Sequence, residues 1–169
     1  MNRMNLSDLE TLAEFHYWAT RRVLDAVEPL TPEQFTRDLG NSFPSVRDTL
    51  AHLYGGDWIW CCRWDGESPA ALPEAKNFPD LASIRKAWDT HEPTLRAVLK
   101  RFGEGGIDQP VEYTRNGVRQ AQPFSQTFQH LMNHGTYHRG QVITMLRQLR
   151  VKSVPSTDLI AFYREQQGV

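Results

Sequence analysis

The stretch Gln129–Gln141, QHLMNHGTYHRGQ, carries His130, His134 and His138, each four residues from the next. Four residues is slightly more than one turn of an α-helix, so the three imidazoles rise along one side of a helix. Histidines with this spacing can bind one metal ion together, because neutral imidazole is a common nitrogen ligand for zinc, nickel, copper and iron. The stretch therefore predicts a metal site on a long helix.

A helical wheel separates the three histidines. With Leu131 at the centre of the apolar face, His138 points into the core, His134 flanks it and His130 turns towards the rim. Two neighbouring histidines inside a helical bundle each need a polar partner, because a buried polar group without one is costly. A shared metal ion would satisfy both. The alternative interpretation is a pair of core histidines bonded to carbonyls or carboxylates.

Two ligands do not complete a metal site, since zinc takes four ligands or three protein ligands with water in an open position. His52 lies mid-helix in an otherwise apolar segment and is the natural third ligand. His16 also lies on a core face and competes for this role. His91, close to Pro93, is expected to be a packing or surface residue.

Hydrophobic periodicity and capping patterns predict four long helices. They run from the capping box Ser7-x-x-Glu10 to Pro29, from Ser45 to about Trp64, from Pro79-Asp80 to Phe102 and from Phe124 to about Leu149.

Shorter elements surround the predicted helices. Asn116-Gly117 indicates a β-hairpin over residues 111–122, and Thr31-Pro32 starts a short helix. A short final helix starts at Pro155, Ser156, Thr157 and Asp158. The predicted fold class is all-α: one domain over residues 1–169, an up-down four-helix bundle with a small β-hairpin before the last long helix and a short C-terminal helix.

Composition excludes several classes of function. The net charge of −1, with scattered Lys and Arg, does not favour nucleic-acid binding. No run of about 18 apolar residues is present, so we expect no membrane span. Residues 1–10 lack an apolar signal core. Cys61 and Cys62 are adjacent and are expected to be reduced, which together with the missing signal suggests a cytoplasmic protein.

The histidine stretch, together with other segments, resembles the DinB/YfiT-like superfamily of four-helix metalloproteins. The resemblance covers nearly the whole chain, with His16 at a position where the family usually has Asn. It is carried by the motif Asn133, His134, His138, Arg139, Gly140 and Gln141, by FHYWATRR at 15–22, by TLAHLYGGDWIW at 49–60 and by the tail VPSTDLIAFYRE at 154–165.

The resemblance implies a metal ion held by His52, His134 and His138. It implies that the metal ion is nickel or zinc, with manganese or iron also possible. It also implies that the protein forms a homodimer. Relatives with known activity are thiol-dependent, which suggests a low-molecular-weight thiol as a further cofactor. The resemblance does not identify which small molecule is the substrate.

Asp57 is the candidate catalytic helper, because it matches the family's acidic position and lies on an apolar stripe of its helix. It could support a ligand by a hydrogen bond, act as a base or ligand, or be a structural buried acid. Gln141 lies on the flank of His134 and could bond a ligand or line a pocket, whereas Arg139 is expected in a salt bridge between helices or in a dimer contact.

Three neutral imidazoles would leave a divalent ion with an open position. Such an ion lowers the pKa of a bound water to about 7, or of a bound thiol below about 8.5, so it fits both hydrolysis and thiol transfer. Two hypotheses follow: a metal-dependent thiol S-transferase or hydrolase, and a metal-binding stress or interaction protein without turnover. A third, weaker hypothesis is a vestigial site without metal.

Overall fold

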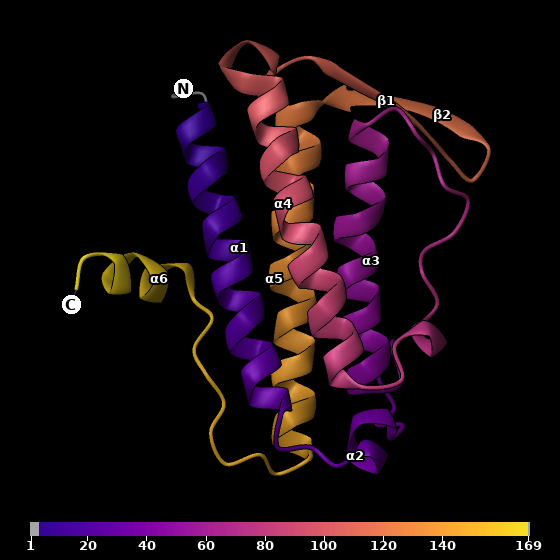
Figure 1. Ribbon diagram of the computed structural model, residues 1–169, viewed down its shortest axis with the longest axis vertical. Coiled ribbons are helices and arrows are strands. Elements are labelled where there is room, and N and C mark those ends of the chain that lie inside the picture. Colours follow the sequence, from indigo (N-terminus) through magenta and orange to yellow (C-terminus); the bar gives the residue numbers. More distant parts are fainter. Residues whose placement is uncertain (1–3, 169) are drawn as a thin grey trace.

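The computed structural model describes residues 4–168 and consists mainly of helices (Figure 1). The long helices are α1 (Leu6–Val27), α3 (Val46–Trp64), α4 (Leu81–Gly106) and α5 (Phe124–Gln148). The shorter elements are α2 (Pro32–Thr36), the 3-10 helix η1 (Ala75–Asn77), β1 (Pro110–Arg115), β2 (Val118–Pro123) and α6 (Leu159–Gln166). The predicted class is confirmed: a helical bundle with a hairpin before the last long helix and a short C-terminal helix.

The first helix begins earlier than its sequence pattern predicted. Asn5 is the N-cap of α1, and its side chain accepts a hydrogen bond from the Asp8 amide at 3.0 Å while Asp8 accepts one from the Asn5 amide. The predicted box Ser7-x-x-Glu10 is therefore wrong, because Ser7 already lies in the first helical turn. The other predicted caps are confirmed: Thr31 on α2, Ser45 on α3 and Asp80 on α4.

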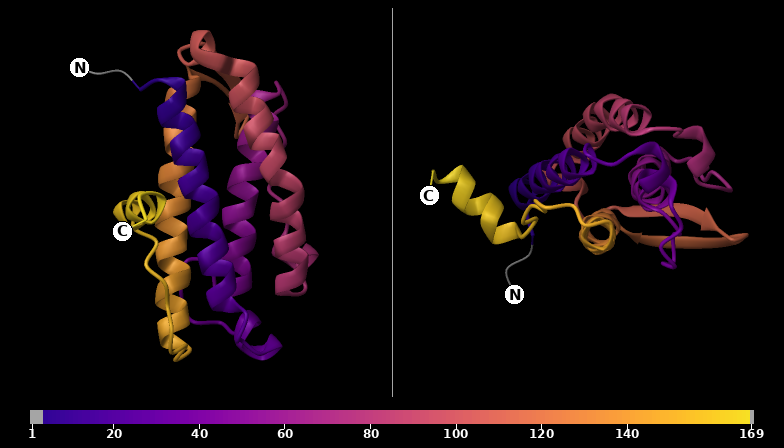
Figure 2. Two further views of the ribbon diagram at one scale, coloured as in Figure 1. Left: turned by 60° about the vertical axis from the view of Figure 1, so that its left-hand side comes forward. Right: turned by 90° about the horizontal axis from the view of Figure 1, so that it is seen from below.

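The long helices form a ring in which α1 contacts α4 and α5, and α3 contacts the same two helices from the other side (Figure 2). The expected up-down alternation holds from α1 to α3 and from α4 to α5. Helices α3 and α4 instead run in the same direction: Tyr54 packs on His91, and further along both helices the Trp64 carbonyl accepts a hydrogen bond from Arg101. The reason is the long connection 65–80, which returns along the bundle before α4 begins.

Apolar side chains from all four long helices fill the centre of the ring. Leu50 and Leu53 of α3 and Leu131 of α5 are fully buried, and burying each such side chain contributes roughly 1.5–3 kcal/mol. Within residues 4–168, no helix is both long enough and apolar enough to cross a membrane. The buried faces of α3 and α5 turn His52 and the α5 histidines towards one another.

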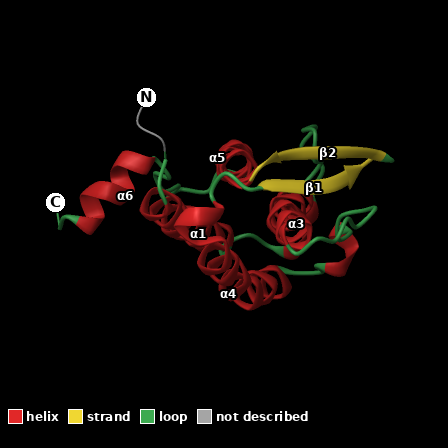
Figure 3. Ribbon diagram, turned by 90° about the horizontal axis from the view of Figure 1, so that it is seen from above, coloured by secondary structure: helices red, strands yellow, loops and turns green. Residues whose placement is uncertain are grey.

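The hairpin lies across one end of α3 and α5 (Figure 3). Its strands pair antiparallel, and Asn116 (φ 50°) and Gly117 (φ 76°) form the tight turn that their sequence predicted. The ring of Tyr113 packs on Trp60 of α3 with a centroid distance of 5.1 Å. The hairpin turn is thereby held beside the face of α3 that carries the histidine site.

Candidate metal centre

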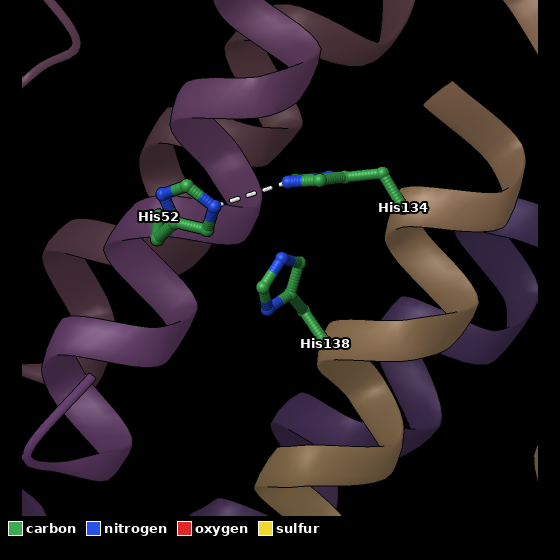
Figure 4. A group of neighbouring side chains, drawn as sticks. All are labelled: His52, His134 and His138. Carbon is green, nitrogen blue, oxygen red and sulfur yellow. Dashed lines mark hydrogen bonds between the residues drawn. The ribbon is translucent and has the colours of Figure 1, made fainter. Parts of the chain in front are cut away.

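Three histidines from two helices meet between α3 and α5. His52 extends from α3, and His134 and His138 extend from successive turns of α5 (Figure 4). One ligand atom from each of the three lies within 4.8 Å of the others, and the Nε2 atoms of His52 and His134 are 3.1 Å apart. The structure thus brings together all three residues expected as ligands. His130 is exposed and outside the group, as the helical wheel predicted.

The spacing of these nitrogens fits a shared metal ion. Two nitrogens bound tetrahedrally to one zinc at about 2.0–2.1 Å are roughly 3.3 Å apart, close to the distance between His52 and His134. Among the residues that the structure describes, no fourth His, Cys, Asp or Glu joins the group. Three histidines without a fourth protein ligand are the arrangement typical of a metal site with an open position.

The three rings are neutral at neutral pH, the state in which imidazole binds metal. Burial, followed by the nearby His138 and His52, lowers the pKa of His134 to about 3. Burial and then His138 lower the pKa of His52 to about 4. The pKa of His138 is also lowered by burial, and the hydrogen bond that His138 donates to Gln141 works in the opposite direction. The lone pairs needed for metal binding are therefore available.

Neighbouring residues fix the orientation of each ring. The Oε1 atom of Gln141 lies 2.6 Å from Nδ1 of His138 and accepts its proton, which leaves the Nε2 lone pair for a metal. Phe43, from the connector before α3, stacks on His52 with a centroid distance of 4.0 Å. A Cβ atom at Gly56 would lie 2.5 Å from Cε1 of His134, so only glycine leaves room for this ring.

Sequence reasoning identified Gln141 as a candidate but missed Phe43 and Gly56. A pattern that could have indicated Gly56 is present. The pair Gly55-Gly56 lies inside a helix, where each glycine costs about 1 kcal/mol relative to alanine, so a close approach of another group is a reasonable expectation.

His16, which competed with His52 as third ligand, lies in a separate polar cluster. Its Nε2 atom is 2.9 Å from Oδ2 of Asp57, and both side chains are fully buried. The indole of Trp88 donates a second hydrogen bond to the same carboxylate at 3.3 Å. Asp57 is therefore not in the histidine group. His91 is buried beside Tyr54 and has the packing role expected of it.

Arg139 completes this cluster from α5. The side chain is 1% exposed, and its NH1 group donates to Nδ1 of His16 at 3.0 Å. Because arginine can only donate, Nδ1 of His16 accepts and its Nε2–H donates to Asp57. Arg139 does connect two helices, as expected, but through hydrogen bonds to α1 rather than through a salt bridge.

A pocket of about 500 Å³ opens beside the histidine group. Its walls come from α3, α5, the hairpin turn and the segment 68–72. Two of the three histidines, His52 and His134, border it. Its other lining residues include the apolar Ile59, the aromatic Trp60 and the basic Arg63 and Arg115. Sequence reasoning did not find this pocket, because its walls are brought together only by the packing of the hairpin on the bundle.

Comparison with known proteins identifies the family of this chain. The chain is 26% identical over 152 residues to the "Protein DinB" of Bacillus subtilis (strain 168), an alignment that covers 86% of this chain and 88% of the relative. The family model described as "DinB family" matches residues 1–168. Since that match extends over nearly the entire chain, the protein belongs to the DinB family.

Proposed function

We propose that this chain is a divalent-metal-dependent enzyme of the thiol S-transferase or hydrolase type, with His52, His134 and His138 as metal ligands. The observation that supports it is an open group of three neutral histidines at the edge of a pocket of about 500 Å³. A structural metal site is normally closed by four protein ligands, whereas a catalytic site keeps a position for water or substrate.

Nickel or zinc suits three imidazole nitrogens best, and manganese or iron is also possible. When bound, such an ion lowers the pKa of a water to about 7, or of a thiol below about 8.5, and so produces a nucleophile. The chain's own residues orient the ligands and shape the pocket. Gln141 holds the tautomer of His138, Phe43 stacks on the ring of His52, and the apolar side chain of Ile59 lines the pocket.

Asp57 is proposed to assist the centre through His134 rather than as a base in contact with substrate. Its carboxylate is fully buried, bonds His16 and Trp88, and does not line the pocket. Burial lowers the pKa of His134, and the negative charge of Asp57 acts in the opposite direction and raises it. The carboxylate therefore interacts electrostatically with that ring. Its Oδ1 atom and the Nδ1 atom of His134 are both buried without a hydrogen-bond partner.

Metal content tests the proposal. Protein purified without a nickel column should contain close to one divalent ion per chain by elemental analysis, and His134→Ala should lose most of it. His130→Ala is the matched control: its ring lies one helical turn away, outside the ligand group, so its metal content should be unchanged. No metal in the wild-type protein, even after addition of zinc, nickel or manganese, would refute the proposal.

A second candidate is a metal-binding stress or interaction protein without turnover. It is favoured by the lining of the pocket, which among the described residues includes no carboxylate that could act as a general base. Spectroscopy of the cobalt-substituted protein separates the two candidates. A fourth protein ligand would support the closed, non-catalytic site, and exchangeable water or thiol would support the enzyme. A cytoplasmic location and a homodimer are part of the proposal and stay predictions.

A further inference from the structure

We propose that the pocket beside the histidine group recognises a small molecule with a carboxylate, which binds to Arg63 and Arg115 while the reacting end lies at the histidines. This inference rests on the proposed function, because the histidine group supplies the reacting end. It adds the class of substrate and the residues that select it.

The charged side chains that line the pocket are all basic. Arg63 and Arg115 line it together with His52, His130 and His134, and among the described residues the lining includes no Asp or Glu. A divalent ion at the histidines would add two further positive charges. A cleft lined by one sign of charge attracts ligands of the opposite sign, so the expected ligand is an anion.

Arg63 is the main recognition residue because it is a buried cation without a carboxylate partner. Its side chain is 9% exposed, and its Nε atom has no hydrogen-bond partner. Several other arginines form ion pairs with carboxylates; Arg101, for example, bonds Asp65, and Arg119 bonds Glu112. Within residues 4–168 no ion pair of Arg63 is present. A buried charge without a partner is costly, and a bound anion would remove this cost.

Two aromatic rings hold the guanidinium of Arg63 in place. It stacks on Trp60 and on Tyr113 of the hairpin, at 4.7 Å from each ring centroid. Contact with the rings covers the faces of the guanidinium, and its two terminal nitrogens, which are not among the buried unpartnered atoms, match the two oxygens of a carboxylate. Arg115, next to the hairpin turn, is exposed and lines the same pocket as Arg63. Burial is the main cause that lowers the pKa of Arg63, and the nearby charge of Arg115 lowers it further. The two cations can therefore act on one anionic group.

The helix geometry sets the length of the ligand. Gly56, which contacts His134, and Arg63 are seven residues apart on α3, which corresponds to about 10 Å along the helix axis. The wall between them includes the apolar Ile59. This spacing suits an extended molecule with a reactive group at one end, an aliphatic middle and a carboxylate at the other end. The pocket volume is in the range of small-molecule sites and does not suit a polymer.

Thiol probes of matched length test the inference. In the cobalt-substituted protein, visible absorption reports binding of a thiolate to the metal without any turnover. Mercaptohexanoate should bind about 10- to 100-fold more tightly than the neutral mercaptohexanol, the range expected for charge-assisted hydrogen bonds. Mercaptoacetate is too short to reach Arg63 and should have no such advantage over mercaptoethanol.

Variants assign the effect to residues. Arg63→Gln should abolish most of the advantage of mercaptohexanoate, and Arg115→Gln should reduce it. Arg63→Lys, which keeps the charge but loses the planar fork, should be intermediate. The matched control is Arg119→Gln, an exposed hairpin arginine that bonds Glu112 and does not line the pocket. Melting curves show whether each variant is folded. If Arg63→Gln does not fold, Arg115→Gln still tests the proposal.

The outcomes distinguish the two proposals. Equal affinity for mercaptohexanoate and mercaptohexanol in a protein that binds cobalt would overturn the carboxylate site and leave the metal centre intact. If no cobalt binds, the proposed metal centre fails. The carboxylate site is then measured on the metal-free protein by tryptophan fluorescence during titration with hexanoate, since Trp60, one of the five tryptophans, lines the pocket. Absence of saturable binding, or equal binding by Arg63→Gln, would overturn the carboxylate site.

Discussion

Gly56 has no side chain at the point where α3 meets the ring of His134. A methyl group there would lie 2.5 Å from Cε1 and 2.8 Å from Nδ1 of that ring, closer than carbon and nitrogen atoms approach. We predict that Gly56→Ala displaces His134 and weakens metal binding about 10- to 100-fold, the usual effect of disturbing the residues that orient a ligand. Competition with a chelator measures the affinity.

The preceding glycine provides the control. A Cβ atom at Gly55 would lie 3.3 Å from Cβ of Leu72 in a surface segment, a contact that needs a shift of only a few tenths of an ångström and involves no histidine. Gly55→Ala should therefore keep metal affinity and gain up to about 1 kcal/mol from better helix propensity. Gly56→Ala with wild-type affinity would show that the ring of His134 is not constrained by this close contact.

The contrast between His134 and Gly56 shows what sequence can predict at the scale of residues. The spacing of His134 and His138 follows from the helical repeat, so their common face was predictable from one helix alone. The position of His52 in an apolar helix made it the natural third ligand, but His16 competed with it and the family resemblance was needed to choose between them. Gly56 and Phe43 depend on the contact between two elements, which no pattern within one element records.

At the scale of elements, one buried cluster connects all four long helices. Its members are His16 of α1, Asp57 of α3, Trp88 of α4 and Arg139 of α5, linked by hydrogen bonds at 2.9, 3.3 and 3.0 Å. The neutral ring of His16 lies between the carboxylate and the guanidinium. Each helix is thereby held in a fixed register relative to its neighbours.

We predict that Asp57→Asn lowers the free energy of unfolding by about 3–5 kcal/mol, because it leaves the Arg139 cation buried without a counter-charge. Urea denaturation measures this change. The control is Asp25→Asn, which removes an exposed partner of Arg85 and should cost less than about 1 kcal/mol. Similar losses in both variants would mean that the buried cluster contributes no more than a surface ion pair.

The elements themselves were largely predictable, whereas their arrangement was not. Apolar periodicity predicted all four long helices, and Asn116-Gly117 predicted the hairpin, since these patterns are local. The N-cap at Asn5 was missed because Ser7-x-x-Glu10 has the same local pattern two residues later. The parallel pair α3 and α4 depends on the path of the connection 65–80, and the pocket depends on where the hairpin packs. Neither is recorded in helical periodicity.

For the whole molecule, a single chain is sufficient to form the site. All three candidate ligands and the basic pocket residues belong to one copy, within the part of the chain that the structure describes. A homodimer therefore stays a prediction, and the geometry of the site does not require it.

The stability of the whole molecule without metal should depend on pH through these histidines. The pKa of His134 falls from 6.5 in the unfolded chain to about 3 in the folded chain, chiefly by burial. Between these values the unfolded state binds more protons, so stability is constant above pH 6.5 and declines as the pH falls below it. His134 alone accounts for a loss of about 2 kcal/mol by about pH 5. The half-buried His52 adds in the same direction, with a smaller effect because of solvent screening.

Urea denaturation in the presence of a chelator, at neutral pH and at about pH 5, measures this loss. His134→Ala should show a smaller decrease between the two conditions than the wild-type protein, because the substitution removes a group that is protonated in the unfolded chain but kept neutral in the folded chain. The variant separates this effect from general acid destabilisation, which both proteins share. Equal decreases in both proteins would mean that the ring of His134 is not held in its neutral form by burial, and would remove one argument for its readiness to bind a metal ion.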